Sequence, residues 1–248
     1  EPFVADDPGA SQYKWYSIRP GGEGDYTNWP FDQGAPYVDQ NENGMYDVGE
    51  PPLLIGDMTA FSVWNDLAAH TEYSTNKLSV EIGQTVFAFN RADALGDMQF
   101  IKWRLVNKSG VDWDSTYFSI WLDPDVGGAT DDLVGCDPML GLGYCYNGDN
   151  DDQSYGAAPP ALGVDFFQGP VIDNPDSTVI LPDGTTLTGK EMLKMTSFVF
   201  YNNNDDPVNG NPQSGKDVWN FMRAIWRNDQ PITQGGRGTD TNAERAFF

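Results

Sequence analysis

The sequence predicts an all-β protein, mainly an antiparallel β-sandwich, with two short peripheral helices. The 27 glycines and 17 prolines interrupt the chain at intervals of about ten residues, which is typical of short strands joined by turns. Alternating or aromatic-rich runs lie between these breaks. Hydrophobic residues make up 39% of the chain and aromatic residues 13%, which is enough to build a buried core.

The predicted strands are residues 59–64, 78–82, 85–90, 100–107, 115–122, 163–168, 178–181 and 196–201. Lys108, Ser109 and Gly110 separate 100–107 from 115–122, so these two runs are expected to form an antiparallel hairpin with a longer loop. The pair Asp183-Gly184 predicts a tight turn between residues 179–181 and 185–187.

Two capping patterns predict the helices. Thr188 followed by Glu191 predicts a short helix to about Lys194, and Ser214 with Asp217 opens a second one. The second helix carries an apolar stripe that is expected to pack on a sheet, formed by Val218, Trp219, Phe221, Met222, Ile225 and Trp226.

The charge is strongly acidic, with 37 Asp and Glu against 14 Lys and Arg and a net charge of −23. Such a field repels nucleic acid and anionic membranes and favours bound cations. No run of about 20 apolar residues exists, so we expect no membrane insertion. We expect one β-rich extracellular domain over residues 1–248, with residues 1–38 as an extension. The start at Glu1 and the end at Phe248 suggest a processed or excised part of a larger chain.

The sharpest local pattern is residues 39–50 (DQNENGMYDVGE). Its oxygen-bearing side chains occupy the ligand positions of a calcium loop of EF-hand type, Gly44 stands at the sharp turn, and Met45 would contribute its backbone carbonyl. Pro51-Pro52 forbids a following helix, so a structural ion fits better than a switch. The alternative is a solvated polar turn. The predicted ligands are Asp39, Asn41, Asn43, Met45, Asp47 and Glu50.

A second acidic region follows residue 122, and carboxylates crowded in this way repel one another unless a cation neutralises them. We expect a second calcium site here, or else a solvated acidic loop; its candidate ligands are Asp123, Asp125, Asp131, Asp132 and Asp137. Further polar residues come just after Cys145, from Asn147 to Asp152. The chain is thus expected to carry long calcium-binding loops.

The two cysteines, Cys136 and Cys145, predict a disulfide in a glycine-rich loop, with two buried free thiols as the alternative. The single histidine, His70, excludes a zinc site built on several histidines, and we interpret it as a structural hydrogen-bonding residue. No catalytic constellation is visible, so we do not predict an enzyme. A glycosidase-type pair of carboxylates would leave no local motif.

Carbohydrate binding is the alternative function, as a binding module or an accessory domain of a polysaccharide-degrading enzyme. Exposed aromatic faces stack on sugar rings, although aromatic residues also dominate β-sandwich cores. The candidates are Trp15, Trp29, Trp64, Trp113 and Trp121.

Several motifs also resemble a known family: residues 56–59 (GDMT) leading to 63–66 (VWND) and His70, then 100–108 (FIKWRLVNK), 121–125 (WLDPD), 131–137 (DDLVGCD), 144–147 (YCYN) and 163–170 (GVDFFQGP). In this order, over residues 39–248, they resemble an N-terminal region of large secreted bacterial surface proteins exported by the type IX secretion route. The resemblance implies export to the outer surface or medium, and supports a structural ion and a disulfide in the second acidic region. It supplies no catalytic residues.

Asp114-Ser115-Thr116 and Asp176-Ser177-Thr178 resemble the O-glycosylation sequence of bacteria with this route, so Ser115 and Ser177 are candidate glycosylation sites, or else plain strand-edge hydroxyls. Together these observations favour a calcium-stabilised extracellular structural or adhesive domain of the cell surface. It would be a subunit of a surface layer or filament, in contact with copies of itself or with other surface proteins.

Overall fold

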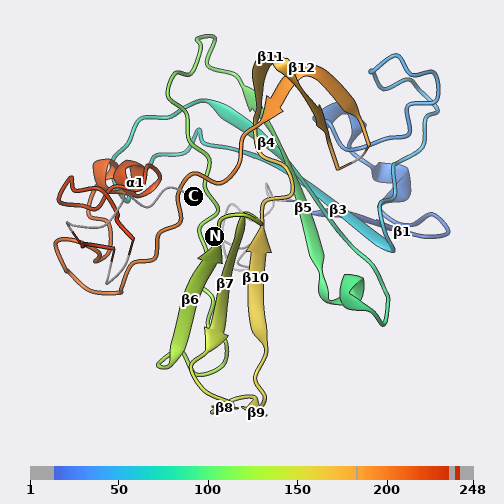
Figure 1. The fold of residues 1–248 in the computed structure, drawn as a ribbon. Coiled ribbons are helices and arrows are strands. Elements are labelled where there is room, and N and C mark those ends of the chain that lie inside the picture. Colours follow the sequence, from blue (N-terminus) through green and yellow to red (C-terminus); the bar gives the residue numbers. More distant parts are fainter. Residues whose placement is uncertain (1–13, 183, 235–237, 241–248) are drawn as a thin grey trace. The chain divides into compact units, whose positions relative to one another are not determined.

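The computed structural model describes residues 14–182, 184–234 and 238–240. Antiparallel sheets dominate it, as the sequence predicts (Figure 1). The chain separates into two compact units, residues 1–113 and 114–248.

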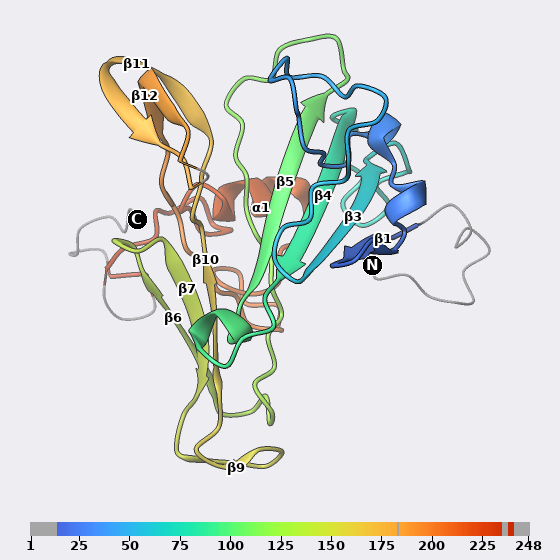
Figure 2. The ribbon, with the colours of Figure 1, turned by 90° about the vertical axis from the view of Figure 1, so that its right-hand side faces the viewer.

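The first unit is built on a five-stranded antiparallel sheet with the order β2-β1-β3-β4-β5 (Figure 2). Its strands are β1 (Tyr16–Arg19), β2 (Glu23–Gly24), β3 (Met58–Asn65), β4 (Val80–Ala88) and β5 (Gln99–Asn107). Short 3-10 turns occur at Tyr26–Asn28, Phe31–Gln33 and Ala94–Asp97. The predicted strands 59–64 and 100–107 are therefore confirmed, whereas 78–82 and 85–90 merge into the single strand β4.

One face of this sheet carries the core of the first unit. Its buried residues are Ile18, Trp29, Ala35 and Phe61, with Leu54 and Val63 among the partly buried side chains around them. Because Trp29, Ala35 and Leu54 all come from the connection between β2 and β3, that connection packs on the sheet. Residues 39–50, the predicted calcium loop, belong to the same connection and start from this rigid base.

The second unit holds a three-stranded antiparallel sheet with the order β10-β7-β6, formed by β6 (Asp132–Asp137), β7 (Leu142–Asn147) and β10 (Ala161–Asp165). A two-stranded sheet joins β11 (Val171–Ile180) to β12 (Thr186–Met192), and a minimal one joins β8 (Asp151–Asp152) to β9 (Gly156–Ala157). The predicted turn before β12 is present, since Leu181 donates its N–H to the Thr185 carbonyl at 2.9 Å; Asp183 lies outside the described residues.

The second predicted helix is confirmed and short, α1 (Gly215–Phe221). The Ser214 side chain accepts the Asp217 N–H as the expected N-cap. Its apolar residues do not pack on a sheet, however: Phe221 is buried with Ala224, Trp226 and Ile232 from the following turns. Trp219 is 44% exposed and the Arg223 guanidinium lies 3.4 Å from its ring centroid.

Three predicted elements are wrong. Residues 188–194 belong mostly to β12, because pairing with β11 and the positive φ of Gly189 (74°) outweigh the local capping pattern. Residues 115–122 form no strand: Ser115 adopts a left-handed φ of 52°, and the chain turns after β5, where the Asn107 side chain bonds the Ser109 N–H and the Val111 carbonyl. The hairpin with β5 is therefore absent, and β5 pairs with β4 instead. Residues 196–201 lie outside the strands as well.

Candidate functional site

The ends of the 39–50 loop are held together by main-chain hydrogen bonds. Val38 donates to the Pro51 carbonyl at 2.9 Å and Leu53 donates to the Pro36 carbonyl at 3.0 Å, around an antiparallel bridge between Tyr37 and Pro52. The two prolines that forbid a helix thus begin a return segment beside residues 36–38. The loop therefore leaves the unit and re-enters it at one point.

Inside the loop, the side chains at the predicted ligand positions turn toward one another. The Asp39 carboxylate accepts the N–H groups of Asn43 at 3.2 Å and Gly44 at 2.7 Å. The amide groups of Asn41 and Asn43 both donate to one Asp47 oxygen, at 2.7 and 2.8 Å. Gly44 has a φ of 77°, so the turn that the sequence placed there needs a residue without a Cβ.

Glu50 closes the loop from its other end. Its side chain is only 7% exposed, and its two oxygens accept the N–H groups of Gln40 at 2.7 Å and Asp47 at 2.9 Å. The neighbouring Tyr37 is affected by this concentration of charge. Its pKa is raised above 10.0 by burial and then by the negative charges of Asp39, Glu50 and Asp47. Three carboxylates of the 39–50 loop therefore contribute to the raised pKa of one phenol group.

Aromatic contacts fix the loop on the unit. The Tyr46 ring stacks on Phe31 with a centroid distance of 4.1 Å and meets Tyr37 edge-on at 5.5 Å. Tyr46 occupies the loop position between Met45 and Asp47, where the calcium-loop pattern has an apolar residue that faces the protein. Met45 itself is 66% exposed, so only its backbone is available as a ligand.

The donor set of this loop is chemically suited to calcium, which prefers carboxylate, amide and carbonyl oxygens. In this structure, the side-chain oxygens of the loop accept hydrogen bonds from N–H groups of the same loop. Within the described residues, no three His, Cys, Asp or Glu side chains are placed so that they could hold a metal ion. Ion binding would require the Asn41 and Asn43 amides to turn their oxygens inward. The residues able to hold the ion are the predicted ones: Asp39, Asn41, Asn43, the Met45 carbonyl, Asp47 and Glu50.

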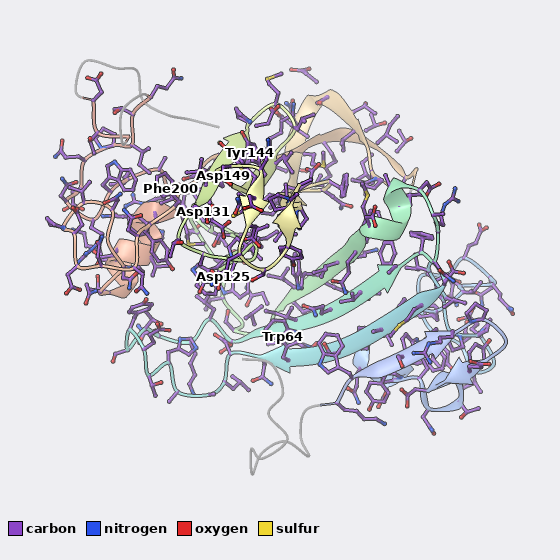
Figure 3. The ribbon with its side chains drawn as sticks, turned by 90° about the horizontal axis from the view of Figure 1, so that it is seen from below. Trp64, Asp125, Asp131, Tyr144, Asp149 and Phe200 are labelled. Atoms are coloured by element: carbon purple, nitrogen blue, oxygen red, sulfur yellow. The ribbon has the colours of Figure 1, made fainter. Side chains whose placement is uncertain are left out.

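The predicted ligands of the second acidic region do not all lie at one place in the structure. Asp132 begins β6 and Asp137 ends it, so about 17 Å of extended strand separates them and they do not share one ion. Asp137 instead accepts the N–H groups of Met139 and Leu140 and closes the β6–β7 turn. Asp123, Asp125 and Asp131 are exposed. Asp125, Asp131 and Asp149 lie in one region of the view onto the open end of this hairpin (Figure 3).

Two buried polar residues of this region, Asn147 and Asp152, are not among the ligands predicted from the sequence. Asn147 is 7% exposed and pairs directly with Asp132 across the β6–β7 ladder, and Asp152 is 4% exposed. The sequence signal for Asn147 is the alternation in residues 142–147, which form the strand β7 although their glycines resemble those of a loop.

The predicted disulfide is absent, because Cys136 and Cys145 are both free thiols. In the β6–β7 register Cys136 pairs with Gly143 and Cys145 pairs with Val134, so the two cysteines are diagonal neighbours. Diagonal residues stand about 7 Å apart, beyond the reach of a disulfide. Burial raises the pKa of both thiols; Asp137 adds to this at Cys136, and Asp132 and Asp125 do so at Cys145.

The remaining candidates lie apart from these loops. Ser115 is exposed, whereas Ser177 is half-buried within β11. His70 lies between the Thr75 hydroxyl at 2.9 Å and the Asp66 carbonyl at 3.1 Å, in agreement with a structural hydrogen-bonding role.

Comparison with protein families, with curated proteins and with solved structures finds no match to this chain. In the described part of the chain, no helix has the length and apolar character needed to cross a membrane.

Proposed function

We propose that this protein is a calcium-stabilised structural or adhesive domain of the bacterial cell surface, a subunit of a surface layer or filament. The observation that carries the proposal is the 39–50 loop, where five side chains with oxygen ligands converge between two clamped ends. A protein of charge −23 gains from a cation held at such a point, because the ion offsets repulsion among carboxylates.

An ion in this loop would connect chain segments that the fold already brings close. Asp39 follows the Tyr37 bridge and Glu50 precedes Pro52, so one ion would join both ends of the loop to its tip. Calcium that binds only the folded state stabilises it by mass action. Extracellular calcium modules work at about 10⁻⁴–10⁻³ M affinity, which suits a structural ion outside the cell.

A chelator experiment tests the proposal. We expect EDTA to lower the melting temperature of the protein, calcium to restore it, and the double variant Asp39→Ala, Glu50→Ala to remove the difference. The variant Asp97→Ala, an exposed aspartate of the same unit, serves as the charge control and should keep the calcium response. Melting curves that coincide with and without EDTA would count against the proposal.

The β-sandwich is part of the same proposal. Cross-strand register places Trp64, Trp103 and Leu105 on the sheet face opposite Phe61, and they are 47%, 38% and 41% exposed. A second layer would cover this face, as sandwiches require. Light scattering of the purified protein with and without calcium tests assembly: growth of the particles with calcium supports a filament subunit, and a monomer under both conditions opposes it.

Polysaccharide binding remains the second candidate, because several tryptophans are exposed. Trp15 is 50%, Trp64 47% and Trp121 65% exposed, whereas Trp29 is buried in the core. Such faces can stack on sugar rings. Affinity electrophoresis in gels that contain polysaccharide, with Trp64→Ala and Trp121→Ala compared with the wild type, would detect it. Equal mobility in all gels would eliminate this candidate.

Export by the type IX route and O-glycosylation at Ser115 and Ser177 complete the proposal. The exposure of Ser115 makes it the more accessible acceptor. Intact-mass measurement of the protein secreted by its native host, compared with the Ser115→Ala variant, tests this directly.

A further inference from the structure

Two buried oxygens at the open end of the β6–β7 hairpin have no hydrogen-bond partner within the described chain: Asp132 Oδ1 and Asn147 Oδ1. These residues face each other in the ladder, so their side chains leave the same face of the sheet. Both atoms are acceptors and cannot satisfy each other. A buried acceptor without a partner destabilises the fold by about 1–3 kcal/mol, so a donor or a cation is expected between them.

The other polar atoms of these two residues are already used. Asp132 Oδ2 accepts the Val126 N–H at 2.8 Å, and the Asn147 amide nitrogen donates to the Asp149 carbonyl at 3.2 Å. These bonds fix the rotation of both side chains. The unpartnered oxygens are thus held in place rather than free to turn toward solvent.

The chain segment around this hairpin is acidic. The sequence contains no Lys, Arg or His between Lys108 and Lys190. The buried Asp152 carboxylate lies nearby along the chain and accepts N–H groups of Gly128, Ser154 and Tyr155. The exposed residues Asp125, Asp131 and Asp149 lie on the same side of the view in Figure 3. The chain segment that forms this end of the hairpin therefore contains no basic residue.

We propose that Asp132 Oδ1 and Asn147 Oδ1 are two ligands of a hard divalent cation, calcium in an extracellular setting, at the open end of the β6–β7 hairpin. Calcium binds oxygen donors of this type, and water completes its shell. Asp137, at the opposite end of β6, is not a ligand. This site belongs to the second unit and does not depend on the 39–50 loop.

Substitution of Asn147 by Asp gives a test in which the effect depends on calcium. In EDTA, Asn147→Asp places two buried carboxylates opposite each other and should lower the melting temperature. In 10 mM calcium, a concentration on the order of ten times the weakest affinity of extracellular calcium modules, the extra charge strengthens the site. The loss should then shrink to that of the one hydrogen bond to the Asp149 carbonyl, which the variant cannot make in either buffer. A bridging water, or an Asn147 amide that donates to Asp132, predicts the same destabilisation in both buffers. That result would overturn the proposal.

Ion counting gives the second readout. Equilibrium dialysis with calcium should show that Asp132→Asn loses one ion per chain, while Asp137→Asn, the same change on the same strand, loses none. Both variants are also measured in the Asp39→Ala, Glu50→Ala background. Calcium binding by the 39–50 loop and calcium binding by this second site are then counted separately. An unchanged ion count for Asp132→Asn in both backgrounds contradicts the inference.

Discussion

Two hydrogen bonds, each with a backbone N–H as its donor, link Asp47 and Glu50. The Glu50 carboxylate accepts the Asp47 N–H at 2.9 Å, and the Asp47 carbonyl accepts the Glu50 N–H at 3.1 Å. The last turn of the 39–50 loop is therefore ordered by hydrogen bonds within the chain.

The variant Glu50→Ala should destabilise the protein even without calcium. It leaves the Gln40 and Asp47 N–H groups without their buried acceptor, at a cost of about 1–3 kcal/mol in the free energy of unfolding. Glu50→Gln keeps one oxygen and should cost less. Urea unfolding in EDTA measures both variants, and equal stability of Glu50→Ala and the wild type would refute the role assigned to Glu50.

Asp66 should make stability depend on acid pH. Burial alone would raise the pKa of Asp66, but the N–H groups of Leu78, Val80 and Ser79 outweigh it and hold the pKa below 3.8. A carboxyl group with a depressed pKa stabilises the fold above its unfolded pKa, and this stability is lost as the pH falls through the folded value. Asp66→Asn should therefore cost about 1–3 kcal/mol at pH 7 and progressively less below pH 3.8.

Urea unfolding of the wild type and Asp66→Asn from pH 7 to pH 2 checks this prediction. The two stabilities should approach each other in acid. A gap that stays constant over the whole range would show that the ionised carboxylate contributes nothing.

Gly127 should be intolerant of a side chain. A Cβ there would lie 2.1 Å from Asp152 Oδ1, and the φ of 85° disfavours other residues as well. Gly156 has a φ of 70° with open space around it, so Gly156→Ala isolates the backbone strain. Both variants should lose about 1 kcal/mol from strain, and Gly127→Ala should lose more. Thermal melts of the pair measure the difference, and equal losses would contradict the close contact.

Ser214→Ala should weaken α1 by removing the side-chain acceptor of the Asp217 N–H. The expected loss is about 1 kcal/mol, and Ser214→Asp should retain most of the stability because aspartate is also a good N-cap. Chemical unfolding followed by Trp fluorescence is suitable, since Trp226 is buried beside Phe221. A loss of the same size in both variants would argue against capping.

The features that the sequence predicted correctly are local ones. Ser214 and Asp217 are three residues apart, and β3 and β5 each carry four β-branched or aromatic residues. The sharp turn at Gly44 was predictable for the same reason, because it depends on one continuous segment. Whether it binds calcium stays a prediction.

The features that the sequence did not predict depend on distant partners. Residues 188–194 have a helix-capping pattern, yet their strand forms because β11 supplies a partner. Asn147 became a candidate ligand only when the register placed it opposite Asp132, and the same register separates Cys136 from Cys145. The β6–β7 hairpin is difficult to predict from the sequence because it contains glycines at 135, 141 and 143, and glycine is more typical of a loop than of a strand.

The bridge between Tyr37 and Pro52 has a consequence for protein engineering. It places the entry and exit of residues 38–51 at the spacing of paired strands, about 5 Å. A segment whose two ends are neighbours can replace a hairpin turn in another protein without displacing the strands on either side. We therefore expect that residues 37–52 can be transplanted as one segment into a host that offers Tyr46 an aromatic partner in place of Phe31.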